Sequence, residues 1–171
     1  FMNKIRLGVP KGSLNTVGRG NTHQLFVDAG YDIKGYEPKK ESDKRLRIAN
    51  DPEVELALVR PQSAPVELSR ELLDIAVVGK DWIEEESVNM TDTELKLIGD
   101  LNYGKTRLVI CIKNEEPYQN LTEFFEAQRG RKTPILCFTE YPNVTRKRFM
   151  QDPVYQELFG SSKPLIQVRG L

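Results

Sequence analysis

The sequence has little of the chemistry on which many metal-binding and catalytic proteins depend. Its 171 residues include two cysteines and one histidine. The cysteines are far apart in the sequence, so we expect no zinc site. His23 has no supporting motif around it, so we expect neither a Ser-His-Asp triad nor a Cys-His pair. Cys111 and Cys137 lie within apolar, strand-like runs, which predicts buried free thiols.

The sequence also lacks long apolar runs and an excess of charge of either sign. Apolar runs such as Leu108–Ile112 are far shorter than the roughly 18 residues of a membrane-spanning helix. The first residues contain no apolar stretch of signal-peptide length, so we expect a cytoplasmic protein with no membrane contact. The 25 Lys and Arg residues balance 25 Asp and Glu residues. That balance argues against a broad nucleic-acid surface, but it allows a small anion site.

What remains is a globular chain of alternating strands and helices. Hydrophobic residues make up 39% and charged residues 29% of the sequence, which excludes a disordered chain. Short apolar runs predict strands at Lys4–Val9, Leu46–Ala49, Val54–Val59, Ile75–Val78, Leu95–Ile98, Thr106–Ile112, Pro134–Phe138 and Leu165–Val168. Helical spacing predicts helices at Thr22–Ala29, Ala64–Leu73, Lys80–Glu86, Leu121–Gln128 and Val144–Phe159, the last broken or kinked at Pro153.

This alternation predicts an α/β fold with mostly parallel sheets. Between Leu95–Ile98 and Thr106–Ile112 the connection is too short for a crossover helix, which indicates that the chain passes from one lobe to another. We therefore expect a first α/β lobe over 3–100 and a second, partial lobe over 101–171. The crossover between them is expected near 100–107.

Candidate site residues occur where the predicted strands end. Lys11, Gly12 and Ser13 follow the first strand, and Arg60 follows the strand Val54–Val59. Ligands of α/β proteins collect beyond the carboxyl ends of strands, where Lys and Arg can bind phosphate. The loop lacks the full pattern of a nucleotide-binding P-loop, so a plain surface turn remains an alternative.

Three later segments share this placement. Gly79 and Asp81 follow the apolar run Ile75–Val78, although Asp81 is equally well explained as the acidic residue that favours a helix start. Tyr103, Gly104 and Arg107 lie on the expected crossover, and Glu140 lies between a strand and a helix. Together these residues predict a cleft between two α/β lobes that faces a phosphorylated ligand.

The sequence resembles the catalytic chain of ATP phosphoribosyltransferase, the first enzyme of histidine biosynthesis. The similar stretches are Leu7–Leu14, Leu58–Gln62, Leu73–Trp82, Asp100–Leu108 and Thr139–Asn143, in the family's order from about residue 3 to residue 150. The resemblance implies two lobes like those of periplasmic binding proteins of type II. It implies a reaction with Mg²⁺ that joins N1 of ATP to C1 of phosphoribosyl pyrophosphate and releases pyrophosphate.

The resemblance also suggests roles for the candidate residues and partners for the chain. Lys11, Arg60 and Glu140 become candidate catalytic residues, whereas Gly12, Ser13, Gly79, Asp81, Tyr103, Gly104 and Arg107 become candidate substrate- and nucleotide-binding residues. It implies no metal ligand among these residues. Histidine is implied as a feedback inhibitor, and the chain is expected in a homo-oligomer or in a complex with a regulatory subunit.

One family motif is not found in this sequence. Family members carry an acidic residue followed by a Thr-Gly-x-Thr-Leu loop that binds the 5′-phosphate, and Gly160–Lys163 does not match it. We therefore expect a truncated or divergent member that binds nucleotide without turnover. The alternative is a non-catalytic two-lobe binding protein for a small anion or nucleotide, which would not need the loop.

Overall fold

The computed structural model describes residues 4–18, 20–38, 46–90, 95–132, 135–160 and 166–169. The chain divides into two compact units, Phe1–Thr106 and Arg107–Leu171. Within the described ranges, none of the helices has the length and apolar character needed to span a membrane.

The first unit is built on a parallel sheet. The strands β1 (Ile5–Pro10), β6 (Val54–Val59) and β7 (Ile75–Ala76) lie in the order β6-β1-β7, with β1 parallel to both neighbours. The helices α1 (Thr22–Asp28), α2 (Ala64–Ser69) and α3 (Lys80–Glu86) alternate with these strands along the chain. The α/β class and the parallel pairing predicted from the sequence are confirmed.

Two small antiparallel ribbons complete the first unit. The strands β2 (Asn15–Thr16) and β3 (Gly20–Asn21) form one ribbon just before α1. The strands β4 (Ile33–Lys34) and β5 (Arg47–Ile48) form the other.

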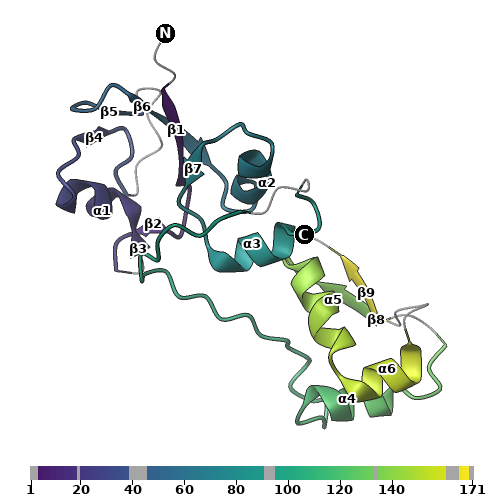
Figure 1. The fold of residues 1–171 in the computed structure, drawn as a ribbon. Helices are drawn as coiled ribbons and strands as arrows, with labels where there is room; N and C mark the ends of the chain where they lie inside the picture. The colour runs from purple at the N-terminus through teal and green to yellow at the C-terminus, as the bar shows by residue number, and fades with distance from the viewer. Residues whose placement is uncertain are drawn as a thin grey trace. The chain divides into compact units, whose positions relative to one another are not determined.

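Alternation of side chains along β1 and β6 gives this sheet two apolar faces. Leu56 and Val9 pack with Phe26 of α1, whereas Val59 packs with Ala64 of α2 and with Leu73. The helices α1 and α2 therefore pack on opposite faces of the sheet, as Figure 1 also shows. Gly8 of β1 leaves room for Leu73, since a Cβ at this position would lie 2.8 Å from Leu73 Cδ1.

The described part of the second unit contains a pair of parallel strands and three helices. The strands β8 (Ile135–Phe138) and β9 (Ile166–Arg169) pair with each other, and the helices are α4 (Leu121–Ala127), α5 (Pro142–Met150) and α6 (Pro153–Phe159). Their core is aromatic, with Phe125, Phe149 and Tyr155 almost fully buried. Phe125 and Tyr155 have ring centroids 4.9 Å apart.

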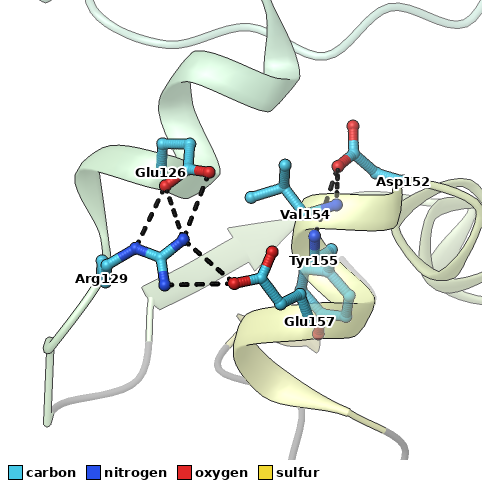
Figure 2. Close-up of polar contacts among 6 residues, drawn as sticks. All are labelled: Glu126, Arg129, Asp152, Val154, Tyr155 and Glu157. Atoms are coloured by element: carbon cyan, nitrogen blue, oxygen red, sulfur yellow. Dashed lines mark hydrogen bonds and ion pairs between the residues drawn. The ribbon is translucent and has the colours of Figure 1, made fainter.

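Polar contacts fix the ends of these helices (Figure 2). The Arg129 guanidinium donates to Glu126 of α4 at 3.0 Å and to Glu157 of α6 at 3.3 Å. These bonds connect α4 to α6. The Asp152 carboxylate accepts from the backbone N–H groups of Val154 and Tyr155 and caps α6. The predicted break at Pro153 is confirmed, because Pro153 begins a new helix where its missing N–H costs nothing.

The predicted strands Leu95–Ile98 and Thr106–Ile112 are wrong. Residues 95–112 have neither helix nor strand, and Ile98 and Val109 are 72% and 61% exposed. Among the described residues, none pairs with this segment as a neighbouring strand, and a strand depends on such a partner for its backbone hydrogen bonds. Cys111 lies in the same segment and is exposed, so the prediction of a buried thiol fails there, whereas Cys137 is partly buried.

Candidate functional site

Lys11 and Arg60 lie at the same edge of the parallel sheet. Pro10 pairs with Val59 at the ends of β1 and β6, so the next residue on each strand is Lys11 and Arg60 respectively. The Lys11 backbone N–H donates to the Val59 carbonyl at 2.9 Å, which extends the pairing into the loop. Both residues are exposed. The parallel register thus places two cations on neighbouring strand ends.

Gly79 and Asp81 follow β7, the third strand of the sheet, toward the same edge. The Val77 N–H donates to the Gly8 carbonyl at 3.0 Å, which continues the alignment of β7 with β1. Gly79 precedes α3, and Asp81 is the acidic residue of its first turn. The Asp81 carboxylate lies against Gly79, where a Cβ would collide with it. A side chain at position 79 would therefore displace Asp81.

The loop after β1 depends on Gly12. Its φ is +90°, a left-handed conformation that other residues rarely adopt, and its carbonyl accepts from the Asn15 N–H at 2.9 Å. A Cβ at Gly12 would meet open space, so glycine is required for its backbone conformation. Gly12 and Ser13 are exposed beside Lys11. The loop therefore offers a cation, a hydroxyl and an accessible backbone to a ligand.

Gly104 packs against Leu14, the residue that follows this loop, and Tyr103 contacts Thr22. The Tyr103 hydroxyl lies 2.8 Å from Thr22 Oγ1, and Thr22 contacts the Leu14 carbonyl. Partial burial raises the pKa of the Tyr103 phenol. Gly104 has a φ of +72°, and a Cβ there would collide with the Leu14 side chain. Most of the candidate residues therefore belong to the first unit, namely Lys11, Gly12, Ser13, Arg60, Gly79, Asp81, Tyr103 and Gly104.

Arg107 and Glu140 belong to the second unit. Arg107 is the first residue of the second unit and is exposed. Glu140 is exposed between β8 and α5. The joint action of these two residues with Lys11 and Arg60 stays a prediction. Of the segment Gly160–Lys163, only Gly160 lies within the described residues.

Three contributors to the site have no signature in the local sequence. The Lys80 ammonium pairs with the Asp100 carboxylate at 2.5 Å and lowers the pKa of that carboxyl group. Tyr36 donates its hydroxyl proton to the Pro10 carbonyl at 2.6 Å, and Thr22 is fully buried behind the loop. Each of these contacts joins residues that are far apart in the sequence, so a local sequence motif does not predict it.

The second unit contains an open groove of about 500 Å³. It is lined by residues Val109–Ile112, Tyr118–Leu121, Phe124, Ile135–Thr139, Thr145 and Phe149. Both cysteines line it, and partial burial raises the pKa of the Cys137 thiol. None of the predicted site residues lines this groove.

Comparisons with known proteins agree with the resemblance. The ATP phosphoribosyltransferase of Desulforudis audaxviator (strain MP104C) is 33% identical over 149 residues, which cover 84% of this chain and 44% of that protein. The enzyme of Pelotomaculum thermopropionicum is 31% identical over 156 residues, covering 88% and 46% respectively. The enzyme of Methanosarcina acetivorans is 31% identical over 148 residues, covering 85% and 44%.

The chain spans less than half the length of these curated relatives. The family model for ATP phosphoribosyltransferase matches residues 60–162, a stretch that begins at Arg60 and includes Gly79, Asp81, Tyr103 and Glu140. Because this match covers more than half of the chain, the chain belongs to the ATP phosphoribosyltransferase family.

Proposed function

We propose that the protein transfers the phosphoribosyl group of phosphoribosyl pyrophosphate to N1 of ATP, with release of pyrophosphate. The observation that carries the proposal is the convergence of Lys11 and Arg60 at one edge of the parallel sheet. Family membership supplies the reaction class. The proposal includes the finer fold, in which the two units are the α/β lobes of a periplasmic-binding-protein-like enzyme.

The proposed chemistry suits the residues at this edge. A bond forms between N1 of adenine and C1 of the ribose, while the bond from C1 to the pyrophosphate oxygen breaks. Negative charge then grows on the departing pyrophosphate, and Lys11 and Arg60 stabilise that charge electrostatically. No covalent enzyme intermediate is needed, which agrees with a site built from cations, glycines and hydroxyl groups.

The described residues also fit Mg²⁺ that arrives on the substrates. Among them, no three His, Cys, Asp or Glu side chains are grouped to hold a metal ion. Mg²⁺ commonly binds through substrate phosphates and one or two carboxylates. Asp81 is the acidic member of the candidate residues at the sheet edge and would supply that carboxylate. The ion would neutralise phosphate charge, while Lys11 and Arg60 orient the pyrophosphate.

The proposal extends to the partners implied by the family. ATP and phosphoribosyl pyrophosphate are the substrates, and histidine acts as a feedback inhibitor. The functional assembly is a homo-oligomer or a complex with a regulatory subunit, in the cytoplasm. The proposal also gives roles in the reaction to Arg107 and Glu140, which lie in the second unit.

The direct test is an assay of the protein at its natural length. ATP, phosphoribosyl pyrophosphate and Mg²⁺ are supplied together, and both pyrophosphate and N1-phosphoribosyl-ATP are measured. We expect the two products to appear in equal amounts and only when both substrates are present. Pyrophosphate release at the level of an enzyme-free control would contradict the proposal.

A further inference from the structure

The loop Lys11–Ser13 is held at both ends by hydroxyl groups behind it. At its start, the Tyr36 hydroxyl donates to the Pro10 carbonyl at 2.6 Å. At its end, Thr22 donates twice to the Leu14 carbonyl, from its backbone N–H at 3.0 Å and from Oγ1 at 2.6 Å. Tyr36 is 3% exposed and Thr22 is fully buried. Both carbonyls that bracket the exposed loop are therefore fixed from the protein interior.

Thr22 also connects this loop to the segment that leaves the first unit. A threonine hydroxyl has one proton, and Thr22 gives it to the Leu14 carbonyl. The Tyr103 hydroxyl, 2.8 Å away, must then be the donor to Thr22 Oγ1. Hydrogen bonds therefore run from Tyr103 through Thr22 to Leu14. Gly104 reinforces the connection because its backbone lies directly against the Leu14 side chain.

We infer that Thr22 is a positioning residue, whose hydroxyl holds the loop Lys11–Ser13, through the Leu14 carbonyl, and the segment Tyr103–Gly104 in one fixed arrangement. The inference deepens the proposed function and rests on it for the identity of the ligand. Thr22 does not touch the ligand, because it is buried behind the loop. It acts through Leu14, whose carbonyl ends the segment that carries Lys11. A loop held in this way loses less conformational freedom when it binds an anion.

The first test measures the binding of Mg-ATP to the 171-residue chain by calorimetry. Thr22→Val removes the hydroxyl and keeps a similar shape, whereas Thr22→Ser keeps the hydroxyl. We expect Thr22→Val to weaken binding about tenfold and Thr22→Ser to stay within about threefold of the unmodified chain. Thr122→Val is the matched control, because it removes one hydroxyl bond, to Asp152, in the second unit. This control should bind Mg-ATP normally.

The second test needs no ligand. Amide hydrogen exchange reports on the bonds from the Lys11 and Asn15 N–H groups and on the segment near Tyr103. We expect Thr22→Val and Tyr103→Phe each to accelerate exchange in both segments at least fivefold, while Thr22→Ser does not. Because Tyr103 is only partly buried, Tyr103→Phe keeps the test valid if Thr22→Val fails to fold.

The outcomes separate this inference from the proposed function. Unchanged exchange in folded Thr22→Val or Tyr103→Phe would overturn the positioning role, and so would a Thr22→Ser variant as impaired as Thr22→Val. Failure of the natural-length protein to form product would instead overturn the proposed function. Accelerated exchange rescued by serine would still support the positioning role in that case.

Discussion

Asp74 binds Arg6 through three hydrogen bonds to its carboxylate. The Arg6 backbone N–H and Nη2 each donate at 2.7 Å, and Nε donates at 3.0 Å. Arg6 lies near the start of β1, and Asp74 directly precedes β7. The pair therefore joins these two strands at the end of the sheet opposite to Lys11. Both side chains are partly exposed, so its contribution to stability is modest.

This pair predicts a loss of stability in acid. Hydrogen bonds from Arg6 lower the pKa of Asp74 from its usual 3.8 to about 2. A carboxyl group with a lowered pKa stabilises the fold above its unfolded pKa, and that contribution is lost as the pH falls from about 4 to about 2. In urea titrations, the free energy of unfolding of the first unit should decrease over this pH range for the unmodified chain. It should decrease less for Asp74→Asn. The exposed Glu116→Gln, in the second unit, is the control. If the free energy of unfolding fell equally with pH for Asp74→Asn and for the unmodified chain, the prediction would be contradicted.

Arg60 and Lys11 are predicted to bind phosphate rather than to stabilise the fold. Arg60→Ala and Lys11→Ala should each weaken Mg-ATP binding by about 1.5–3 kcal/mol, the cost of a lost charge-assisted hydrogen bond. The thermal unfolding midpoint should change little, because both side chains are exposed. The control is Arg70→Ala, which removes another exposed arginine at the end of α2. Unchanged affinity together with unfolding of Arg60→Ala would show that the role of Arg60 is structural.

Gly104 is predicted to be intolerant of a side chain for two independent reasons. Its φ of +72° is unfavourable for alanine, and a Cβ would collide with Leu14. Gly18 has a φ of +86° but open space around it, so Gly18→Ala carries the backbone cost alone. Gly104→Ala should therefore lower the free energy of unfolding by roughly 1–3 kcal/mol more than Gly18→Ala. Equal effects of the two substitutions in denaturant titrations would argue against the contact with Leu14.

The sequence predicted the sheet well because its strands have strong local patterns. The apolar run Val54–Val59 marked β6 correctly, and the parallel pairing of β1 with β6 places Lys11 and Arg60 at one edge. The same reasoning failed for Thr106–Ile112. An apolar run there is compatible with a strand, but a strand also requires a neighbour with which to pair, and the local pattern contains no information about that neighbour.

The site was predictable only where it follows from strand ends. Glycine, Lys and Arg after strands are visible in the sequence, and the structure places them at the sheet edge. The contact between Thr22 and Tyr103 joins residues 81 positions apart. It depends on how α1 and the later segment pack, which no motif near either residue specifies.

The apolar surface of the second unit is predicted to cause association. Val109, Ile110, Leu136 and Phe138 all line the groove, and each is 47–61% exposed. Contiguous apolar surface of this kind favours contact with other molecules. Phe138→Ser should reduce concentration-dependent association in sedimentation velocity, whereas Val88→Ser, at a 67% exposed position in the first unit, should not. A monomer at every concentration tested would contradict the prediction.

The final prediction is that the 171 residues alone bind nucleotide weakly and do not turn over. The sheet edge of the first unit retains Lys11 and Arg60, whose charges can contact phosphate groups of either substrate. The sequence has no Thr-Gly-x-Thr-Leu loop for the 5′-phosphate of phosphoribosyl pyrophosphate. Losing two charge-assisted bonds of roughly 1.5–3 kcal/mol each would lower affinity by a factor on the order of 10² to 10⁴. The reacting carbon would also lack a fixed position, and a misplacement of about 1 Å can cost roughly 10²-fold in rate.

Parallel titrations of the 171-residue chain with Mg-ATP and with phosphoribosyl pyrophosphate measure this difference. We expect saturable ATP binding, much weaker phosphoribosyl pyrophosphate binding, and no N1-phosphoribosyl-ATP above an enzyme-free control. The protein at its natural length, assayed in the same buffer, shows whether the conditions support turnover. If the 171 residues formed product, or bound phosphoribosyl pyrophosphate tightly, a segment other than the family's phosphate loop would have to hold the 5′-phosphate. Gly160–Lys163 would then be the first segment to substitute, because its small polar residues are the nearest match in the sequence.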